Sequence, residues 1–255
     1  MILKTILLNG LFKTIKKHSD QSMAETLDII HKDLLIPIKV IRHARARKIK
    51  LRISKAGGEV KVTIPPKLPL RKAQAFIHEH KNWIIEEFHN SVPLAEITSN
   101  KSFPFQGEEI IIKEDPSRRR GCSREGQILY VPSEDRTLIG SRVKRWLIQE
   151  ARKNIEESLL YYASVMNLSY RSVSISDTKT RWGSCSVKGD LRFNFRLIMA
   201  DQTLLDYVVV HELAHRVHMD HSTSFWALVE DFCPDYKTLR RALKDQAAVL
   251  QAFQF

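Results

Sequence analysis

One short stretch, His211-Glu212-Leu213-Ala214-His215, constrains this chain more than any other part of its sequence. The apolar run before it predicts that the stretch lies on a helix. Two imidazoles one helical turn apart face the same way, so they can bind one metal ion. Glu212 is turned about 100° around the helix from His211, which makes it a poor third ligand. We expect it to act as a general base that takes a proton from water bound to the ion.

The H-E-x-x-H pattern also arises by chance in long chains, so its surroundings matter. Residues 204–210 are almost all apolar, which predicts that the helix is buried. Buried histidine and glutamate side chains need partners, because an unpaired charge in the interior is costly. A metal ion is such a partner. We therefore predict Zn²⁺ as the cofactor.

A catalytic zinc site needs a third protein ligand. The candidates downstream are His218, His221, Glu230 and Asp231. His218 would share the face of the first two histidines if the helix continued, but it would lie about 10.5 Å along the axis from His211. An imidazole does not close that gap while another histidine occupies the middle. We therefore expect the third ligand beyond a break in the helix.

The spacing of His211, His215 and His221 matches the longer zinc motif H-E-x-x-H-x-x-G-x-x-H, with His218 at the position of the glycine. Histidine tolerates left-handed backbone better than most residues do. The turn before the third histidine therefore need not be identical to that of the motif. We favour His221 as the third ligand, and Glu230 is the runner-up.

Several other blocks accompany the histidines in a fixed order. They are K-T-R-W-G-S-C-S at 179–186, R-F-N-F-R-L-I at 192–198, D-Y-V-V-V-H-E-L-A-H at 206–215, Ser222 with Phe225-Trp226, and P-D-Y-K at 234–237. From roughly Ile38 to Leu243, this set resembles the YgjP-like metallopeptidases, relatives of the WLM and SprT-like zincins. Because several ordered blocks agree, the resemblance is more specific than the zinc pentad alone.

The resemblance implies a zincin-like core in which His211, His215 and His221 bind Zn²⁺ and Glu212 is the catalytic base. It also implies that residues 182–185 lead into a strand beside the cleft. The implied activity is that of a zinc metallopeptidase, a hydrolase whose partner is a peptide or protein substrate.

Hydrophobic periodicity and the resemblance together predict an α+β fold with a zincin-like metallopeptidase core. We expect residues 1–35 to be a flexible N-terminal extension, 36–135 to be a β-rich antiparallel region with one helix, and 136–255 to be the catalytic region. Strands are expected at 36–42, 48–54, 60–64, 109–113, 127–131, 173–175 and 191–195, and helices at 70–88, 137–166 and 203–216, with two more after them.

Two local expectations follow for the predicted catalytic region. Ser222 or Asp220 suits the N-cap of the helix that follows the break after the zinc helix. An extended peptide substrate is expected to add, through backbone hydrogen bonds, to an edge strand near 191–195.

Composition bears on partners and location. Lys and Arg number 41 against 29 acids, a net charge of +12, which favours nucleic acid or nucleotides as partners but fits an ordinary basic protein equally well. Three cysteines without a C-x-x-C pair indicate a reducing compartment, so we expect a cytoplasmic protein. No stretch is apolar enough to span a membrane. No small-residue cleavage site follows residues 1–12, so we do not expect an export signal there, and Met23 as the natural start is a hypothesis.

Two other functions compete with a zinc peptidase. The same metal site, with arginines around it, would suit a metal-dependent nucleoside triphosphate pyrophosphatase or phosphohydrolase, although the sequence has no Walker-type glycine loop. Alternatively, the chain would be a nucleic-acid-associated module in which zinc is structural. That second alternative needs a fourth protein ligand, for which the sequence offers no compelling candidate.

Overall fold

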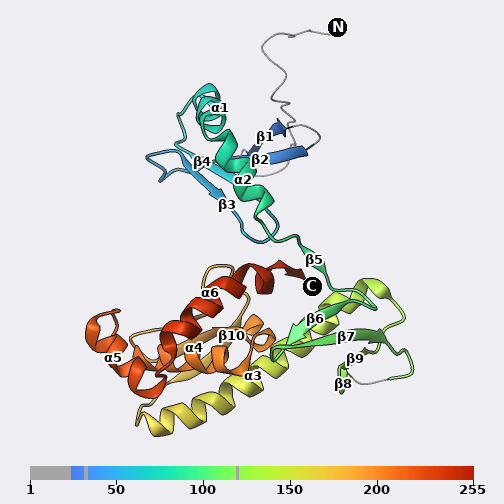
Figure 1. The fold of residues 1–255 in the computed structure, drawn as a ribbon, viewed down its shortest axis with the longest axis vertical. Helices are drawn as coiled ribbons and strands as arrows, with labels where there is room; N and C mark the ends of the chain where they lie inside the picture. The colour runs from blue at the N-terminus through green and yellow to red at the C-terminus, as the bar shows by residue number, and fades with distance from the viewer. Residues whose placement is uncertain (1–23, 32–33, 119–120) are drawn as a thin grey trace. The chain divides into compact units, whose positions relative to one another are not determined.

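A computed structural model describes residues 24–31, 34–118 and 121–255 (Figure 1). The chain divides after Pro93 into two compact units, and each has its own hydrophobic core. The sequence predicts a boundary at residue 135 instead, because both β-rich stretches look alike in their periodicity. The second of these stretches packs with the helices that follow it, so it belongs to the second unit.

The predicted N-terminal extension falls partly outside the described residues. Residues 24–31 form a strand, so this part of the range assigned to the extension is folded into a sheet. The expectations for residues 1–23, including an alternative start at Met23, concern residues that are not described.

The first unit contains one four-stranded sheet and two helices. Its elements are β1 (Ala24–His31), β2 (Leu34–Arg42), β3 (Lys50–Ile53), β4 (Val60–Ile64), α1 (Leu70–Glu79) and α2 (Lys81–His89). The strands lie in the order β1-β2-β4-β3. Alternate residues of β2 and β4 are buried, and their apolar side chains form a core with Ala73, Ile77 and Ile84 of the helices.

This sheet is mixed, which corrects the antiparallel sheet expected from the sequence. β2 and β4 are parallel, while the β1–β2 and β3–β4 pairs are antiparallel. Alternation of apolar residues identified the strands but not their neighbours, because pairing depends on contacts between distant residues. The single helix expected over 70–88 is also two helices, which meet at His80.

The second unit opens with another small sheet. Its strands are β6 (Ser102–Phe105), β7 (Glu108–Glu114), β8 (Ser123–Glu125) and β9 (Ile128–Val131), in the order β6-β7-β9-β8. The central β7–β9 pair is parallel and the outer pairs are antiparallel, so this sheet repeats the strand order and directions of the first. Short strands β5 (Ala95–Glu96) and β13 (Phe253–Gln254) pair with each other.

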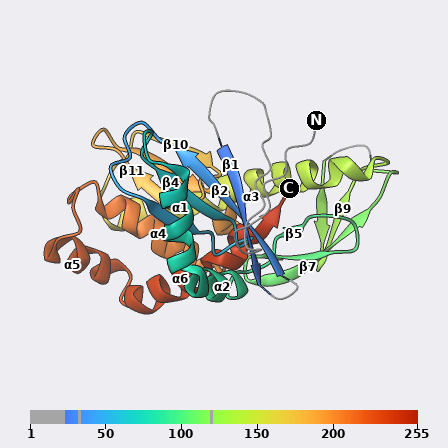
Figure 2. The same cartoon turned by 90° about the horizontal axis from the view of Figure 1, so that it is seen from above.

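Helices and a three-stranded sheet make up the rest of the second unit. They are α3 (Ile139–Val165), β10 (Ser172–Ser176), β11 (Gly183–Cys185), β12 (Asp190–Asn194), α4 (Gln202–Ala214), α5 (Thr223–Phe232) and α6 (Tyr236–Ala252), with 3-10 turns at Arg136–Leu138 and Phe195–Met199. The long helix α3 starts beside the green strands β7 and β9 and then runs along α4 and β10 (Figures 1 and 2). These elements share one core.

The three-stranded sheet has the order β10-β12-β11. β12 is therefore the middle strand, parallel to β10 and antiparallel to β11. This corrects the expectation that residues 191–195 form an edge strand that a peptide substrate could extend. Leu191 and Phe193 on β12 are buried, as a central strand requires, and the edge nearest α4 is β11.

A buried arginine ties the second unit together. Nη1 of Arg196 donates to the carbonyl oxygens of Leu250 and Phe253 at 2.8 and 3.0 Å. Its Nε donates to Asp177 at 3.0 Å, and Lys144 on α3 donates to the other oxygen of that carboxylate at 2.6 Å. The Arg196 side chain is only 7% exposed. The network therefore joins α3, the end of β10 and the C-terminal residues.

Within the part of the chain that is described, no helix has the length and apolar character needed to cross a membrane.

Candidate metal centre

The helix α4 carries the first two histidines. Asp201 caps its N-terminus by accepting a hydrogen bond from the backbone N–H of Thr203 at 2.9 Å. Its apolar residues are buried on all sides, as the run 204–210 predicts. His211 lies in the last turn and His215 is the C-cap, so the helix ends at the second histidine. The helix break expected after the motif is therefore confirmed.

The chain then turns and brings in the third histidine. Ser222 is the N-cap of α5, and its Oγ accepts from the N–H of Phe225 at 3.4 Å, as the sequence predicts. The imidazole just before this cap points back at α4. Nε2 of His221 lies 3.2 Å from Nε2 of His211. One ring nitrogen from each of His211, His215 and His221 lies within 4.8 Å of the others.

The other three candidates for the third ligand do not join this group. Among the described residues, the histidine cluster contains neither His218 nor Glu230 nor Asp231. His218 contributes its backbone instead: Nδ1 of His215 lies 3.0 Å from the His218 carbonyl oxygen. When Nδ1–H donates that bond, the His215 ring presents the lone pair of Nε2 to the cluster.

Aromatic rings stack on two of the three imidazoles. Phe225 stacks on His215 with ring centroids 4.6 Å apart, and Trp226 stacks on His221 at 5.7 Å. Trp226 stacks in turn on Tyr236 of α6 at 5.1 Å. Two consecutive residues in the first turn of α5 therefore orient two imidazoles, which explains why an apolar pair follows the third histidine so closely.

Burial favours the neutral form of His211 and His215. It lowers the pKa of His211 to about 3, with the neighbouring His215 and His221 adding to the effect. Burial also lowers the pKa of His215, against the hydrogen bond to the His218 carbonyl. Neutral imidazoles are the form that binds metal ions.

Glu212 lies beside the cluster in a buried position, 4% exposed. Burial raises the pKa of its carboxyl to about 8, and the positive charge of Arg181 opposes that rise only in part. Its Oε2 is buried and has no hydrogen-bond partner among the described residues. A carboxylate oxygen without a partner in the interior is costly, so the chain by itself leaves this group incomplete.

The residues present fit a zinc ion. Two facing imidazole nitrogens 3.2 Å apart need a proton or a cation between them. Three imidazoles with a carboxyl group alongside are a donor set typical of catalytic zinc, which leaves one position open.

Gly183 is a residue of this site that the sequence did not single out. It begins strand β11, and a Cβ atom placed on it would lie 2.6 Å from Cγ and 2.7 Å from Cδ of Glu212. Glycine is therefore required here by space, because any side chain would displace the carboxyl group. The only available signal was that the glycine belongs to the 179–186 block.

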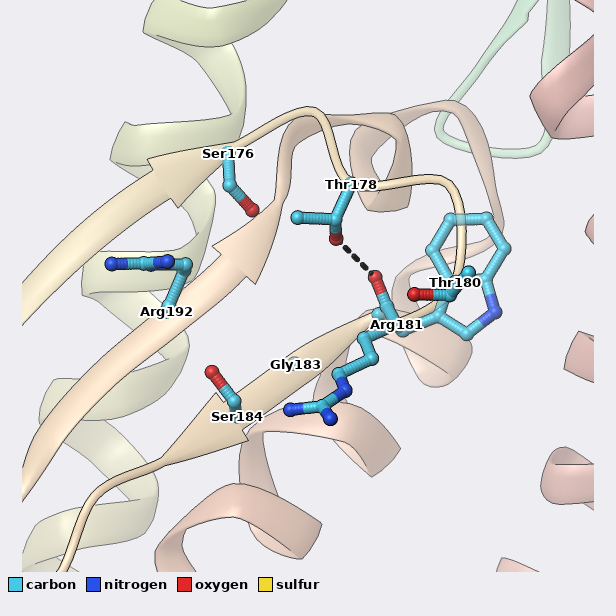
Figure 3. Close-up of a pocket in the computed structure, with 8 residues that line it drawn as sticks. Ser176, Thr178, Thr180, Arg181, Gly183, Ser184 and Arg192 are labelled. Atoms are coloured by element: carbon cyan, nitrogen blue, oxygen red, sulfur yellow. Dashed lines mark hydrogen bonds between the residues drawn. The ribbon is translucent and has the colours of Figure 1, made fainter. Parts of the chain in front are cut away.

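A polar cavity of about 240 Å³ adjoins the same strand (Figure 3). It is lined by Ser176, Thr178, Thr180, Arg181, Trp182, Gly183, Ser184 and Arg192. The sequence left the role of Trp182 open between a core anchor and a cleft wall. The side chain is half-buried, packs against the core and also lines the cavity, so it has both roles.

Comparison with known proteins agrees with the class of protein that the histidine cluster and Glu212 indicate, a metallopeptidase. The YgjP-like metallopeptidase domain matches residues 47–246, so the chain belongs to the YgjP-like family. A comparison with curated proteins finds no significant match.

Two solved structures resemble part of the chain. One is the metallopeptidase zymogen abylysin of Pyrococcus abyssi, with 24% identity, a TM-score of 0.33, and coverage of 36% of this chain and 93% of the other. The second is the metallopeptidase zymogen jannalysin of Methanocaldococcus jannaschii, with 19% identity, a TM-score of 0.33, and coverage of 36% and 95%.

Proposed function

We propose that this protein is a zinc-dependent peptidase in which His211, His215 and His221 hold the ion and Glu212 is the general base. The observation that carries the proposal is the meeting of three imidazole nitrogens within 4.8 Å, next to a buried carboxyl group. The third imidazole comes from beyond the helix, so the cluster is a product of the fold rather than of helical spacing alone.

Glu212 has the properties of a proton acceptor. A zinc ion, when bound, supplies Lewis acidity that polarises a carbonyl and makes water easier to deprotonate. The Glu212 carboxyl then takes the proton from the attacking water and passes it to the leaving amine. Burial raises the pKa of Glu212 to about 8, so its carboxylate form holds a proton more strongly than an exposed carboxylate does, as a general base requires.

We also propose where the peptide lies and which part of the chain does the chemistry. β11 is the sheet edge nearest α4, and Gly183 at its start touches Glu212. An extended peptide that pairs with β11 would bring its backbone past the carboxylate. Residues 136–255, which hold the cluster and the β10-β12-β11 sheet, would form a zincin-like catalytic region.

The experiment compares wild-type protein with Glu212→Gln on a mixture of peptides, with zinc content measured in both. We expect the variant to keep stoichiometric zinc and to lose cleavage. Cleavage at the wild-type rate by Glu212→Gln would remove Glu212 from the mechanism. His211→Ala that still holds stoichiometric zinc would contradict the ligand assignment.

One observation favours a second function, hydrolysis of phosphoanhydrides such as nucleoside triphosphates. Arg181 and Arg192 line the cavity next to Gly183, and guanidinium groups bind phosphate well. Release of phosphate or pyrophosphate that depends on His211 and His215 would support this function over peptide cleavage.

The structure offers less for the alternative of a nucleic-acid module with structural zinc. A closed zinc site has four protein ligands, and the cluster found among the described residues has three. Steep salt dependence of nucleic-acid binding, with no functional loss in Glu212→Gln, would be its signature.

A further inference from the structure

The cavity beside β11 has an unusual balance of hydrogen-bonding groups. Two guanidinium groups and several hydroxyl groups line it, and none of its lining residues is acidic. Thr178 donates to the Arg181 carbonyl oxygen and Ser176 to that of Phe193. By contrast, the side chains of Thr180, Arg181, Ser184 and Arg192 make no hydrogen bond or ion pair within the described part of the chain. The cavity therefore presents donors and positive charge that its own walls do not use.

Strand register holds several of these donors on one face of the sheet. Arg192 on the middle strand lies opposite Ser184 on β11. Ser176 lies two residues beyond the partner of Arg192 on β10, so its side chain points to the same face. Figure 3 shows Ser176 and Thr178, at the end of β10 and in the loop after it, across the same space from Ser184 and the Arg181 side chain at β11. The donors thus come from three paired strands and the loop between two of them.

The arginine on this face of the sheet does not contribute to the hydrophobic core. On β12 the side chains of Leu191 and Phe193 are buried in the core, whereas Arg192 between them is exposed on the cavity side. Arginine binds carboxylate and phosphate through two parallel N–H donors, and hydroxyl groups complete such sites. Two unpaired guanidinium groups in one cavity are therefore suited to an anion.

Gly183 connects this cavity to the candidate metal centre. It lines the cavity, and it also lies against the Glu212 carboxyl group. A ligand held by Arg181 and Ser184 would consequently lie along the short strand β11, which contacts the proposed general base Glu212 through Gly183. We propose that this cavity binds an anionic oxygen group of the substrate, a carboxylate or a phosphate, and so selects substrates that carry one. The assignment to the substrate rests on the proposed function, whereas anion binding itself does not.

The test measures the binding of anionic probes by titration calorimetry at low salt. All proteins are the full zinc-loaded chain and carry Glu212→Gln, so that turnover does not interfere. The probes are inorganic phosphate and a blocked peptide with one glutamate, compared with the same peptide carrying glutamine. Arg181→Gln and Arg192→Gln each remove one guanidinium group from the cavity, and Ser184→Ala removes one hydroxyl group. Lys188→Gln is the matched control, because it removes one positive charge from the exposed β11–β12 connection outside the cavity.

We expect one or both anionic probes to bind, and binding to fall about tenfold or more in each arginine variant but not in Lys188→Gln. Ser184→Ala should weaken binding less, since it removes a neutral donor. Binding of the glutamate peptide alone identifies a carboxylate as the ligand, and binding of phosphate alone identifies a phosphoryl group. No binding of either probe, or equal binding by all variants, overturns the proposal.

This result is separate from the proposed peptidase activity. If wild-type protein cleaves peptides but the cavity binds no anion, only the present inference fails. If Arg181 and Arg192 bind the probes but no peptide is cut in a Glu212-dependent way, the proposed function fails and the anion site remains.

Discussion

Gly183 and Glu212 lie so close that no side chain fits between them. A methyl group on Gly183 would lie 2.6 Å from Cγ of Glu212 and nearer still to Oε1. Gly183 is the first residue of strand β11 and does not have a positive φ. Glycine is therefore required here by the space beside Glu212 and not by the backbone conformation. The edge strand β11 therefore acts as the wall that sets the position of the proposed general base.

Gly183→Ala is expected to displace the carboxyl group while leaving the three histidines in place. A misplacement of about 1 Å costs roughly a hundredfold in rate, so we expect kcat to fall by about that factor with zinc content unchanged. Gly126→Ala controls for the loss of stability alone: its φ of +59° makes alanine strained there, but its methyl group would meet nothing within 4 Å and lies away from Glu212. In the Glu212→Gln background, Gly183→Ala should cause no further loss. A further loss there of the same size would show that Gly183 acts independently of Glu212.

His221 and His218 form a matched pair for testing the third ligand. His221→Ala removes a ring nitrogen from the cluster, whereas His218→Ala keeps the backbone carbonyl that orients His215. Loss of even an outer-shell partner costs about 10–100-fold in metal affinity, so we expect His221→Ala to lose more than about a hundredfold. His218→Ala should bind zinc as wild type does. Competition with a chromophoric chelator measures the zinc affinity of both variants. If His218→Ala lost more affinity than His221→Ala, His218 would be the third ligand and His221 would not.

Metal should stabilise the folded protein through the same three residues. A ligand present at 100 times its Kd stabilises the folded state by about 2.7 kcal/mol. We therefore expect added zinc to raise Tm after removal of metal by chelation, and to leave the Tm of His211→Ala unchanged. Equal shifts in both proteins would place the bound zinc elsewhere.

Arg196 should be important for stability rather than for chemistry. Its buried guanidinium donates to Asp177 and to two carbonyl groups near the C-terminus. Removing one partner of a buried ion pair costs about 3 kcal/mol or more, so Arg196→Met should lower the free energy of unfolding by that amount in urea titrations. Arg152→Met, which breaks a pair that is about half exposed, is the control and should have little effect. Equal stability of the two variants would show that the network contributes little.

Asp177 should make stability depend on pH at the acid end. Burial opposes its ionisation, but hydrogen bonds from Lys144 and Arg196 outweigh burial and lower the pKa of its carboxyl below 3.8. Because the folded-state pKa is the lower one, the contribution is present above the unfolded pKa and is lost as pH falls through the folded pKa. We expect wild type to lose more stability than Asp177→Asn between about pH 5 and 2. Parallel curves for the two proteins would contradict this.

Local spacing predicted much of the site. The turn of the helix places His211 and His215 on one side and Glu212 on another, whatever the rest of the chain does. The start of α5 also followed from local chemistry, since Ser222 caps it as expected. The seven strands expected from apolar patterning lie within one or two positions of observed strands, whereas β1, β5, β6, β8 and β13 were not expected. These features depend on neighbours a few residues away, which the sequence displays directly.

The features that the sequence missed all depend on distant contacts. The parallel β2–β4 pair, the central place of β12 and the unit boundary after Pro93 come from pairing and packing across the chain. A strand shows its own alternation but not which strand it joins, so an antiparallel sheet and an edge position for 191–195 were wrong.

The sequence alone determined which residue types the candidate site would contain: two imidazoles and a carboxyl group on one helix, with a third histidine at motif spacing. Only the tertiary structure decided that His221, rather than His218 or Glu230, meets the other two, and that Gly183 and two unpaired arginines lie on strands beside Glu212. The physical reason is that helical geometry is set by the backbone within a few residues. The meeting of strand, loop and helix is set by burial of side chains far apart in the chain.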